Sequence, residues 1–316
     1  MNVSFINILA LTIFIFYFIF LISFNIIGPD YNSYTAASEL SVTQNFFKLK
    51  EFLSWSIIDM FAQIQSGIDF LGLKFFSSLI FSLIFLYSYE LIKDEFLYTK
   101  IKIKTLPLFR LLLIALTFFV AASPYVNLLA LSALRQGMSL IFLIFVIINI
   151  SSGSKKSLIW FLFAIFSHNS ALIFLPLFVF LIFKNNFLRF SVIFLAVSCF
   201  FIISFFIPFQ PSVDSDNRII YGTFSLLSII FFITKRNNFS ECDLLLISGV
   251  LLVLPFFNLV SYFDRLGLYA AFFSSILIAK KIISTGPRSF SLASTLLLLI
   301  LTLSVTTLIT YPPLIN

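Results

Sequence analysis

Runs of about 20 apolar residues follow one another along almost the whole chain, and each can cross the ~30 Å hydrocarbon core of a bilayer as a helix. Lipid cannot satisfy exposed backbone N–H and C=O groups, so helices are the expected spanning form. Only 10% of the 316 residues are charged and 60% are hydrophobic, which is too little polar surface for a soluble domain. The sequence therefore predicts an all-α polytopic membrane protein, with residues 1–316 forming a single integral membrane domain.

The apolar runs predict about 10–11 transmembrane helices. The first run lacks a basic n-region and an Ala-x-Ala cleavage site, so we expect a retained span and not a signal peptide. Residues 28–70 are the one long polar stretch, and their aromatic residues predict an external, interfacial segment with its rings at headgroup depth. The expected spans are 4–26, 71–89, 107–122, 135–151, 157–167, 169–183, 188–208, 219–234, 243–262, 266–283 and 290–310.

Lysines and arginines divide 14 to 6 between the two sides of these spans. Cytoplasmic loops are enriched in Lys and Arg, so the richer side is predicted to be cytoplasmic. We therefore expect a multi-pass protein of the bacterial inner membrane, with the N-terminus cytoplasmic and the C-terminus periplasmic or external. The net charge of +7 does not indicate nucleic-acid binding, because the lysines fall in short clusters between apolar runs. The richer side holds Lys93, Lys100, Lys102, Lys104, Arg110, Lys155, Lys156, Lys184, Arg189, Lys235, Arg236, Lys280, Lys281 and Arg288, and the poorer side holds Lys48, Lys50, Lys74, Arg135, Arg218 and Arg265.

The two shortest spans, 157–167 and 169–183, are predicted to form a helical hairpin with His168 at its tip. A single span here would move every later loop to the other side and break the charge pattern. The Ser-His-Asn-Ser sequence at 167–170 is typical of turns and helix starts. Such a tip would stop within the outer half of the membrane, where irregular backbone survives only beside protein or a water-filled cavity. The sequence therefore predicts an outward-facing cavity.

A few ionisable residues lie at or near the outer ends of the expected spans. They are Arg135, Asp264 and Arg265, with Arg218 in a loop and His168, the only histidine of the chain, at the hairpin tip. Ionisable groups at membrane depth are costly, so they tend to line cavities and take part in chemistry. Two arginines converging on one cavity suit a diphosphate, because the guanidinium fork pairs with phosphate oxygens. A neighbouring histidine can remove a proton from a sugar hydroxyl near neutral pH.

Each of these residues also has a purely structural interpretation. Arg135 can extend its side chain to the headgroups from a helix end. Arg265 can pair with its neighbour Asp264, and His168 can be a turn residue satisfied by backbone groups. The residue types alone leave both interpretations open. The same holds for three residues in polar loops: Asp30, Tyr34 and Arg218.

Four segments spread over most of the chain resemble a known family. Leu-Arg-Gln-Gly-Met-Ser at 134–139 and Phe-Ser-His-Asn-Ser-Ala-Leu at 166–172 are similar to the EpsG-like and Wzy-type polymerases of bacterial surface polysaccharides. In those proteins an Arg-Gln opens a span and an Ala-x-x-x-His-x-Ser-Ala turn follows. Asp-Arg-Leu-Gly-Leu-Tyr at 264–269 resembles their later arginine, and the Asp and Tyr within 28–34 resemble their Asp-x-x-x-Tyr after the first span. Ser139 departs from the pattern, because the family usually has Ala there.

The resemblance implies a glycosyltransferase that joins undecaprenyl-diphosphate-linked repeat units into O-antigen, capsular or exopolysaccharide at the outer face of the inner membrane. Arg135 and Arg265 would stabilise the diphosphate without a metal or cofactor. His168 would act as general base or position the acceptor. The expected partners are the lipid-linked units, and a chain-length regulator and flippase of the same pathway. The remaining residues expected to bind substrate are Asp30, Tyr34, Gln136, Arg218 and Asp264.

Three other functions remain open. A flippase or other transporter of lipid-linked oligosaccharides predicts polar residues throughout the spans and often an internal repeat, and neither is evident. A membrane O-acyltransferase would also use a lone histidine but would not need the arginines, and a structural subunit would need none of these residues. The chain has no CxxC motif, metal-spaced His/Cys cluster or Gly-rich phosphate loop, so no metal or cofactor is expected.

Overall fold

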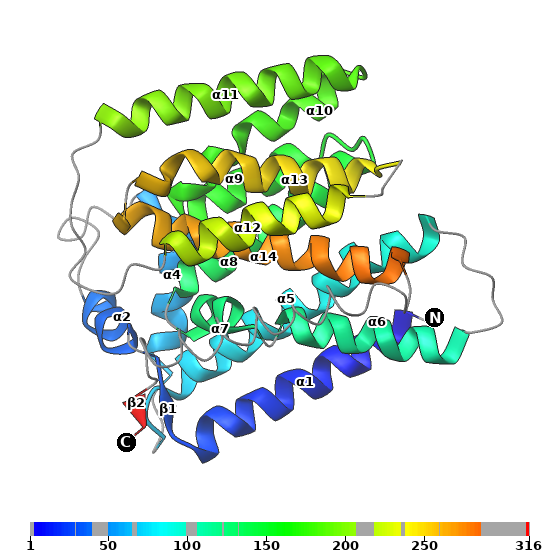
Figure 1. Cartoon of the computed structure of the whole chain (residues 1–316). Helices are drawn as coiled ribbons and strands as arrows, with labels where there is room; N and C mark the ends of the chain where they lie inside the picture. Colours follow the sequence, from blue (N-terminus) through cyan, green and yellow to red (C-terminus); the bar gives the residue numbers. More distant parts are fainter. Residues whose placement is uncertain are drawn as a thin grey trace.

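Helices make up nearly all of the described part of the chain (Figure 1). The computed structural model describes residues 3–28, 30–39, 50–64, 68–98, 106–121, 123–131, 133–206, 218–234, 238–258, 260–285 and 314–315. Within them, five helices are long and apolar enough to cross a membrane: Phe5–Ser23, Leu71–Lys93, Leu134–Ser151, Asn186–Ile203 and Leu266–Ser284. The predicted class, an all-helical multi-pass membrane protein, is confirmed.

The first half of the chain forms α1 (Val3–Ser23), α2 (Tyr31–Ser38), α4 (Phe52–Ala62), α5 (Leu71–Tyr98), α6 (Leu106–Ala121), α7 (Pro124–Leu131) and α8 (Leu134–Ser151). The second half forms α9 (Ser157–Ser167), the 3₁₀ helix η2 (Asn169–Phe178), α10 (Val179–Ile182), α11 (Asn186–Phe206), α12 (Arg218–Ile233), α13 (Glu241–Val253), the 3₁₀ helix η3 (Leu254–Asn258) and α14 (Val260–Thr285). Two short strands, β1 (Ile26–Ile27) and β2 (Leu314–Ile315), pair antiparallel.

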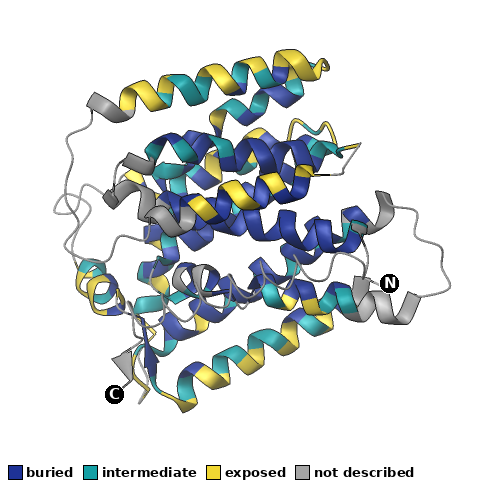
Figure 2. Cartoon of the chain, in the orientation of Figure 1, coloured by how far each residue is buried: buried dark blue, intermediate teal, exposed yellow. Residues whose placement is uncertain are grey.

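The core of the bundle is built around α14, α5 and α8. The apolar stretch of α14 is entirely buried and contacts α5, α12 and α13, whereas α8 contacts α5 and α9. Helices α1 and α11 lie at the periphery and expose most of their apolar side chains (Figure 2). Because exposed Phe and Ile are unfavourable in water and favourable in lipid, this distribution agrees with a membrane protein whose outer helices face hydrocarbon.

The predicted spans and the observed helices differ where proline interrupts the chain. Residues 157–167 are helical as expected, but the second arm of the hairpin is mainly 3₁₀ helix around Pro176, and the expected span 243–262 breaks at Pro255. Proline lacks an N–H and cannot continue an α-helical hydrogen-bond ladder. Helix α7 was not expected, and the expected span 290–310 lies outside the described residues.

The described part of residues 28–70 contains two short helices, α2 and α4. Phe52 is exposed, whereas Trp55 and Ile58 on the same helix are buried against the bundle, and the interfacial position of the stretch stays a prediction. Helix α4 contacts α5, α8 and α9, so its inward face is part of the protein core. The apolar residues of α4 are therefore divided between a packed face and an exposed face, and the packed face brings the start of α4 close to the hairpin.

The turn after α1 is held by a buried lysine. Asn25 adopts a left-handed conformation with φ of +44°, which asparagine tolerates better than most residues. Its Oδ1 accepts a hydrogen bond of 2.8 Å from Nζ of Lys74 at the start of α5. Lys74 is fully buried, so its side chain joins α5 to this turn.

Candidate functional site

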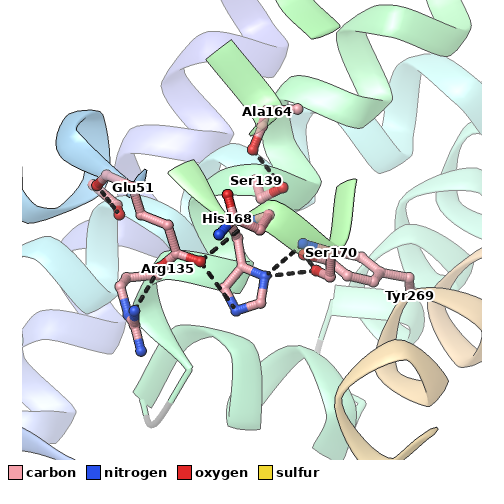
Figure 3. Close-up of polar contacts among 9 residues, drawn as sticks. Glu51, Arg135, Ser139, Ala164, His168, Ser170 and Tyr269 are labelled. Atoms are coloured by element: carbon pink, nitrogen blue, oxygen red, sulfur yellow. Dashed lines mark hydrogen bonds and ion pairs between the residues drawn. The ribbon is translucent and has the colours of Figure 1, made fainter. Parts of the chain in front are cut away.

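A polar cluster forms where α4, α8, the α9–η2 hairpin and α14 meet (Figure 3). It contains Glu51 directly before α4, Arg135 as the second residue of α8, His168 at the hairpin tip and Tyr269 on α14. In Figure 1, α2 and α4 lie at the end of the bundle opposite the N-terminus. The cluster thus lies at the end of the bundle that the charge distribution predicts to face outward.

Arg135 is fixed by a carboxylate and an aromatic ring. Its Nη1 donates a hydrogen bond of 2.5 Å to Oε2 of Glu51, and its guanidinium carbon lies 4.9 Å from the centroid of the Trp55 ring. A positive charge in the first turn of a helix opposes the helix dipole, and the Glu51 carboxylate offsets that cost. The Arg135 side chain is 22% exposed, while its Nε is buried and has no hydrogen-bond partner. This arginine therefore has donor capacity left for a ligand.

His168 interrupts the helix between α9 and η2 in an extended conformation. Its Nδ1 accepts a hydrogen bond of 3.2 Å from the backbone N–H of Ser170 and lies 2.6 Å from the Ser170 hydroxyl. On the other side of the ring, Nε2 lies 4.0 Å from Oε1 of Glu51, the oxygen that accepts a 3.1 Å hydrogen bond from the N–H of Asn169. The residue is only 9% exposed. The reversal predicted at His168 is confirmed, and the wider outward-facing cavity stays a prediction.

Two further hydroxyl groups attach the hairpin to its neighbours. Ser139 Oγ on α8 donates a 3.0 Å hydrogen bond to the carbonyl of Ala164 on α9, so the serine that departs from the family pattern joins two helices. The hydroxyls of Ser170 and Tyr269 share a hydrogen bond of 3.3 Å. Tyr269 is completely buried and thus links α14 to the hairpin tip.

Tyr34 also belongs to the cluster. Its ring packs edge-on against Trp55, with the centroids 5.9 Å apart. Burial raises the pKa of Tyr34 to about 12, even though the positive charge of Arg135 lowers it. The phenol therefore stays protonated near neutral pH and can donate a hydrogen bond. Asp30, one turn earlier at the start of α2, is exposed.

The structure brings some of the predicted residues together and leaves others undetermined. Arg135, His168 and Tyr34 are in one cluster, and Gln136 is buried beside Arg135 on α8. Arg265 lies four residues before Tyr269 in α14. Three side chains lie outside the described residues: Arg218, Asp264 and Arg265.

Sequence reasoning missed Glu51, the residue on which the cluster converges. The polar stretch 28–70 was treated as one interfacial segment, and the carboxylate directly before the apolar helix α4 was the available signal. Glu51 is 84 residues from Arg135 and 118 from Asn169, so only the fold shows the contacts. Among the described residues no group of three or more His, Cys, Asp or Glu side chains could hold a metal ion. Metal independence itself stays a prediction.

Comparison with known proteins gives one match. No curated protein and no solved structure matches the chain significantly. A family model described as "EpsG family" matches residues 8–313, which is nearly the whole chain. The match includes the arginine, the histidine and the helix with the later arginine, as the sequence resemblance predicted. The chain therefore belongs to the EpsG family, which is linked to exopolysaccharide biosynthesis.

Proposed function

We propose that this chain is a polymerase that transfers a growing glycan from undecaprenyl diphosphate onto the next lipid-linked repeat unit, at the outer face of the bacterial inner membrane. One observation carries the proposal. Arg135 and the single histidine of the chain are joined through one buried carboxylate, and Nε of Arg135 is buried without a partner. A flippase or other transporter of lipid-linked units has no need for such a constellation.

A diphosphate is the ligand that best suits the unused donor. Buried polar groups in proteins are almost always hydrogen-bonded, so an unpaired guanidinium N–H indicates a missing acceptor. Phosphate oxygens pair with the planar guanidinium fork. Arg135 also lies in the first turn of α8, at the positive end of the helix dipole. These features favour an anion beside Arg135.

The chemistry requires stabilisation of a leaving group. An acceptor hydroxyl attacks the anomeric carbon of the donor glycan, and the bond between that carbon and the diphosphate oxygen breaks. Negative charge develops on the diphosphate, where Arg135 on α8 and Arg265 on α14 would stabilise it. His168 would orient the acceptor. The function would also require partners in the same pathway, namely a flippase that delivers the units and a chain-length regulator.

The test uses charge-preserving variants in a strain that lacks the native gene. Arg135→Lys and Arg265→Lys keep the positive charge but lose the planar fork. An arginine that only reaches the headgroups should tolerate lysine. A diphosphate ligand should lose ~1.5–3 kcal/mol, roughly tenfold to a hundredfold in rate. His168→Ala should remove polymer while leaving the protein level near normal. The readout is surface glycan resolved on a gel at matched protein level.

The pattern on the gel separates the candidate functions. A polymerase defect leaves single repeat units and removes the ladder above them. A flippase defect removes both, because no unit reaches the outer face, and an acyltransferase defect keeps the ladder and changes only its decoration. Arg189→Lys is the matched control, because Arg189 is held by protein groups alone and its loss should reduce the amount of folded protein and not the ladder at matched level. A full ladder with both lysine variants would refute the assignment of the arginines.

A further inference from the structure

Glu51 is the common partner of the cluster. It is 4% exposed, and its two oxygens accept hydrogen bonds from Nη1 of Arg135 and from the N–H of Asn169. Its Oε1 also faces the imidazole of His168 at 4.0 Å. A carboxylate can accept about four hydrogen bonds, so at least one more donor can be accommodated. Among the described residues, Glu51 is therefore the carboxylate that lies next to both Arg135 and His168.

The hydrogen bonds of His168 determine which ring nitrogen carries the proton. Nδ1 accepts the backbone N–H of Ser170, and an amide can only donate. We therefore assign to the neutral imidazole the tautomer in which Nδ1 accepts from both the amide and the hydroxyl of Ser170 and the proton is on Nε2, the nitrogen that faces Glu51. In this state Nε2 is a donor and cannot accept a proton from a substrate. Of the two roles expected for His168, the geometry favours positioning over base catalysis.

The gap between the two side chains suits one hydroxyl group. A distance of 4.0 Å from Nε2 to Oε1 is too long for a direct hydrogen bond. An oxygen atom about 2.8 Å from each of them would bridge the gap with normal hydrogen-bond lengths. Such a hydroxyl would accept a hydrogen bond from Nε2–H and donate its own hydrogen to the carboxylate.

We propose, building on the proposed function, that the acceptor-sugar hydroxyl occupies this bridge and that Glu51 is the general base of the transfer. The hydroxyl proton moves to Oε1 of Glu51 while the hydroxyl oxygen forms a bond to the anomeric carbon of the donor. The bond between that carbon and the diphosphate oxygen breaks, and its electron pair leaves with the diphosphate beside Arg135. The products are the lengthened glycan, undecaprenyl diphosphate and a protonated Glu51, which then releases its proton to water.

The first test is Glu51→Gln in the full-length protein, purified in lipid nanodiscs. Glutamine keeps the shape and an accepting oxygen but cannot take the proton. General-base catalysis contributes about 10²–10⁴-fold, so polymer formation should fall at least about a hundredfold. Binding of farnesyl diphosphate, a short-chain isoprenoid diphosphate probe, should be unchanged because Arg135 remains. Glu51→Asp, which keeps a carboxylate, should retain more activity than Glu51→Gln.

The matched control is Glu241→Gln at the other end of the bundle. Glu241 also pairs with an arginine, Arg189, at 2.5 Å, but it lies away from the cluster. This exchange should leave polymer formation per folded protein unchanged. Normal polymer formation by Glu51→Gln would overturn the proposal. Loss of farnesyl diphosphate binding in Glu51→Gln would also overturn it, because Glu51 would then act by holding Arg135.

A second measurement needs no variant and no activity. Because His168 is the only histidine, ¹⁵N-histidine labelling of a protein without a polyhistidine tag gives the signals of this one ring. The ¹⁵N shifts should report a neutral ring protonated on Nε2. A proton on Nδ1 would leave Nε2 free to act as the base and would refute the role of Glu51. If wild type fails to restore the ladder, the polymerase function itself fails; if wild type restores it and Glu51→Gln does too, only the role of Glu51 fails.

Discussion

Arg135 and Arg189 are held in nearly the same way at two distant places in the bundle. Each guanidinium lies 2.5 Å from a glutamate oxygen, of Glu51 and Glu241 respectively. Each also stacks 4.9 Å from the centroid of an aromatic ring. Helix α4, which follows Glu51, and the junction of α10 and α11, next to Arg189, lie at opposite ends of the bundle (Figure 1). The two arginines therefore differ mainly in what satisfies their remaining N–H groups.

Arg189 uses all three of its nitrogen atoms within the protein. Its Nε and Nη2 donate to the carbonyls of Phe183 and Phe180, at 2.5 and 2.9 Å, and its Nη1 donates to Asn186 Oδ1 at 3.1 Å. These bonds satisfy carbonyls left free at the end of α10. At Arg135, by contrast, Nε is buried and unpaired. A saturated guanidinium stabilises the fold, whereas an unsaturated one at a helix start is available to a ligand.

The largest effect is expected from topology reporters, which give an all-or-none signal for each end. Fusions after Ile150 and Thr234 should read cytoplasmic, because the 14-to-6 charge split assigns their end to the cytoplasm. Fusions after Gln210 and Asn316 should read external. The measurement is the activity ratio of a cytoplasmic and a periplasmic reporter at each position. An external signal after Thr234 would contradict the prediction that the Arg135 end of the bundle faces outward. The argument for a lipid-linked acceptor at that end would then fail.

A large effect on stability is expected at the Arg189 end from Lys280→Met. Lys280 and Asp243 form an ion pair of 2.6 Å with both side chains fully buried, so the substitution removes the counter-charge of a buried carboxylate. Breaking such a pair costs ~3–5 kcal/mol. Thermal unfolding of the detergent-solubilised protein, followed by size-exclusion, should show a lower midpoint, while polymer formed per folded molecule stays normal.

The control for that substitution is Lys93→Met. Lys93 pairs with Glu90 at 3.1 Å, but both side chains are about two-fifths exposed. Exposed pairs contribute about 0–1 kcal/mol, so the midpoint should hardly move. Equal shifts of the unfolding midpoint in Lys280→Met and Lys93→Met would contradict the distinction between the buried ion pair and the exposed one. An unfolding midpoint equal to that of wild type in the double variant Lys280→Met/Asp243→Asn would support this distinction.

The sequence predicted most of the helices and the reversal at His168, because both depend on local information. Apolar runs and turn residues are read within a few positions, and 157–167 agrees with α9 residue for residue. Burial of the lysines was not predictable in this way. Lys280 and Lys281 were counted only as charges of the cytoplasmic side, yet Lys280 neutralises Asp243, and Lys281 donates to the carbonyls of Phe232 and Thr234 at the end of α12.

The candidate site was predicted in part for the same reason. Arg135 and His168 stand out because ionisable residues are rare in apolar surroundings, and because both lie in segments that resemble the family, 134–139 and 166–172. Glu51 lies in a polar stretch, where a further acidic residue does not stand out. Its importance depends on contacts across 84 and 118 residues of chain. Long-range pairing of this kind leaves no periodic or compositional trace in one sequence.

The smallest effect is expected from Tyr269→Phe, which tests how far the cluster of Glu51, Arg135 and His168 depends on the hydrogen bond from α14. The substitution removes the hydroxyl that bonds Ser170 at 3.3 Å and preserves the buried ring. A single neutral hydrogen bond contributes about 0.5–1.5 kcal/mol, so activity should fall about tenfold at most. The Ser170 amide still bonds Nδ1 of His168, so the ¹⁵N shifts of the ring should still report a proton on Nε2. Tyr87→Phe, on an α5 ring that packs at a tilt against Phe145, is the control and should behave as wild type. If Tyr269→Phe were as inactive as His168→Ala, the Tyr269 hydroxyl would have to contact the substrate itself, and the boundary of the site would move to include α14.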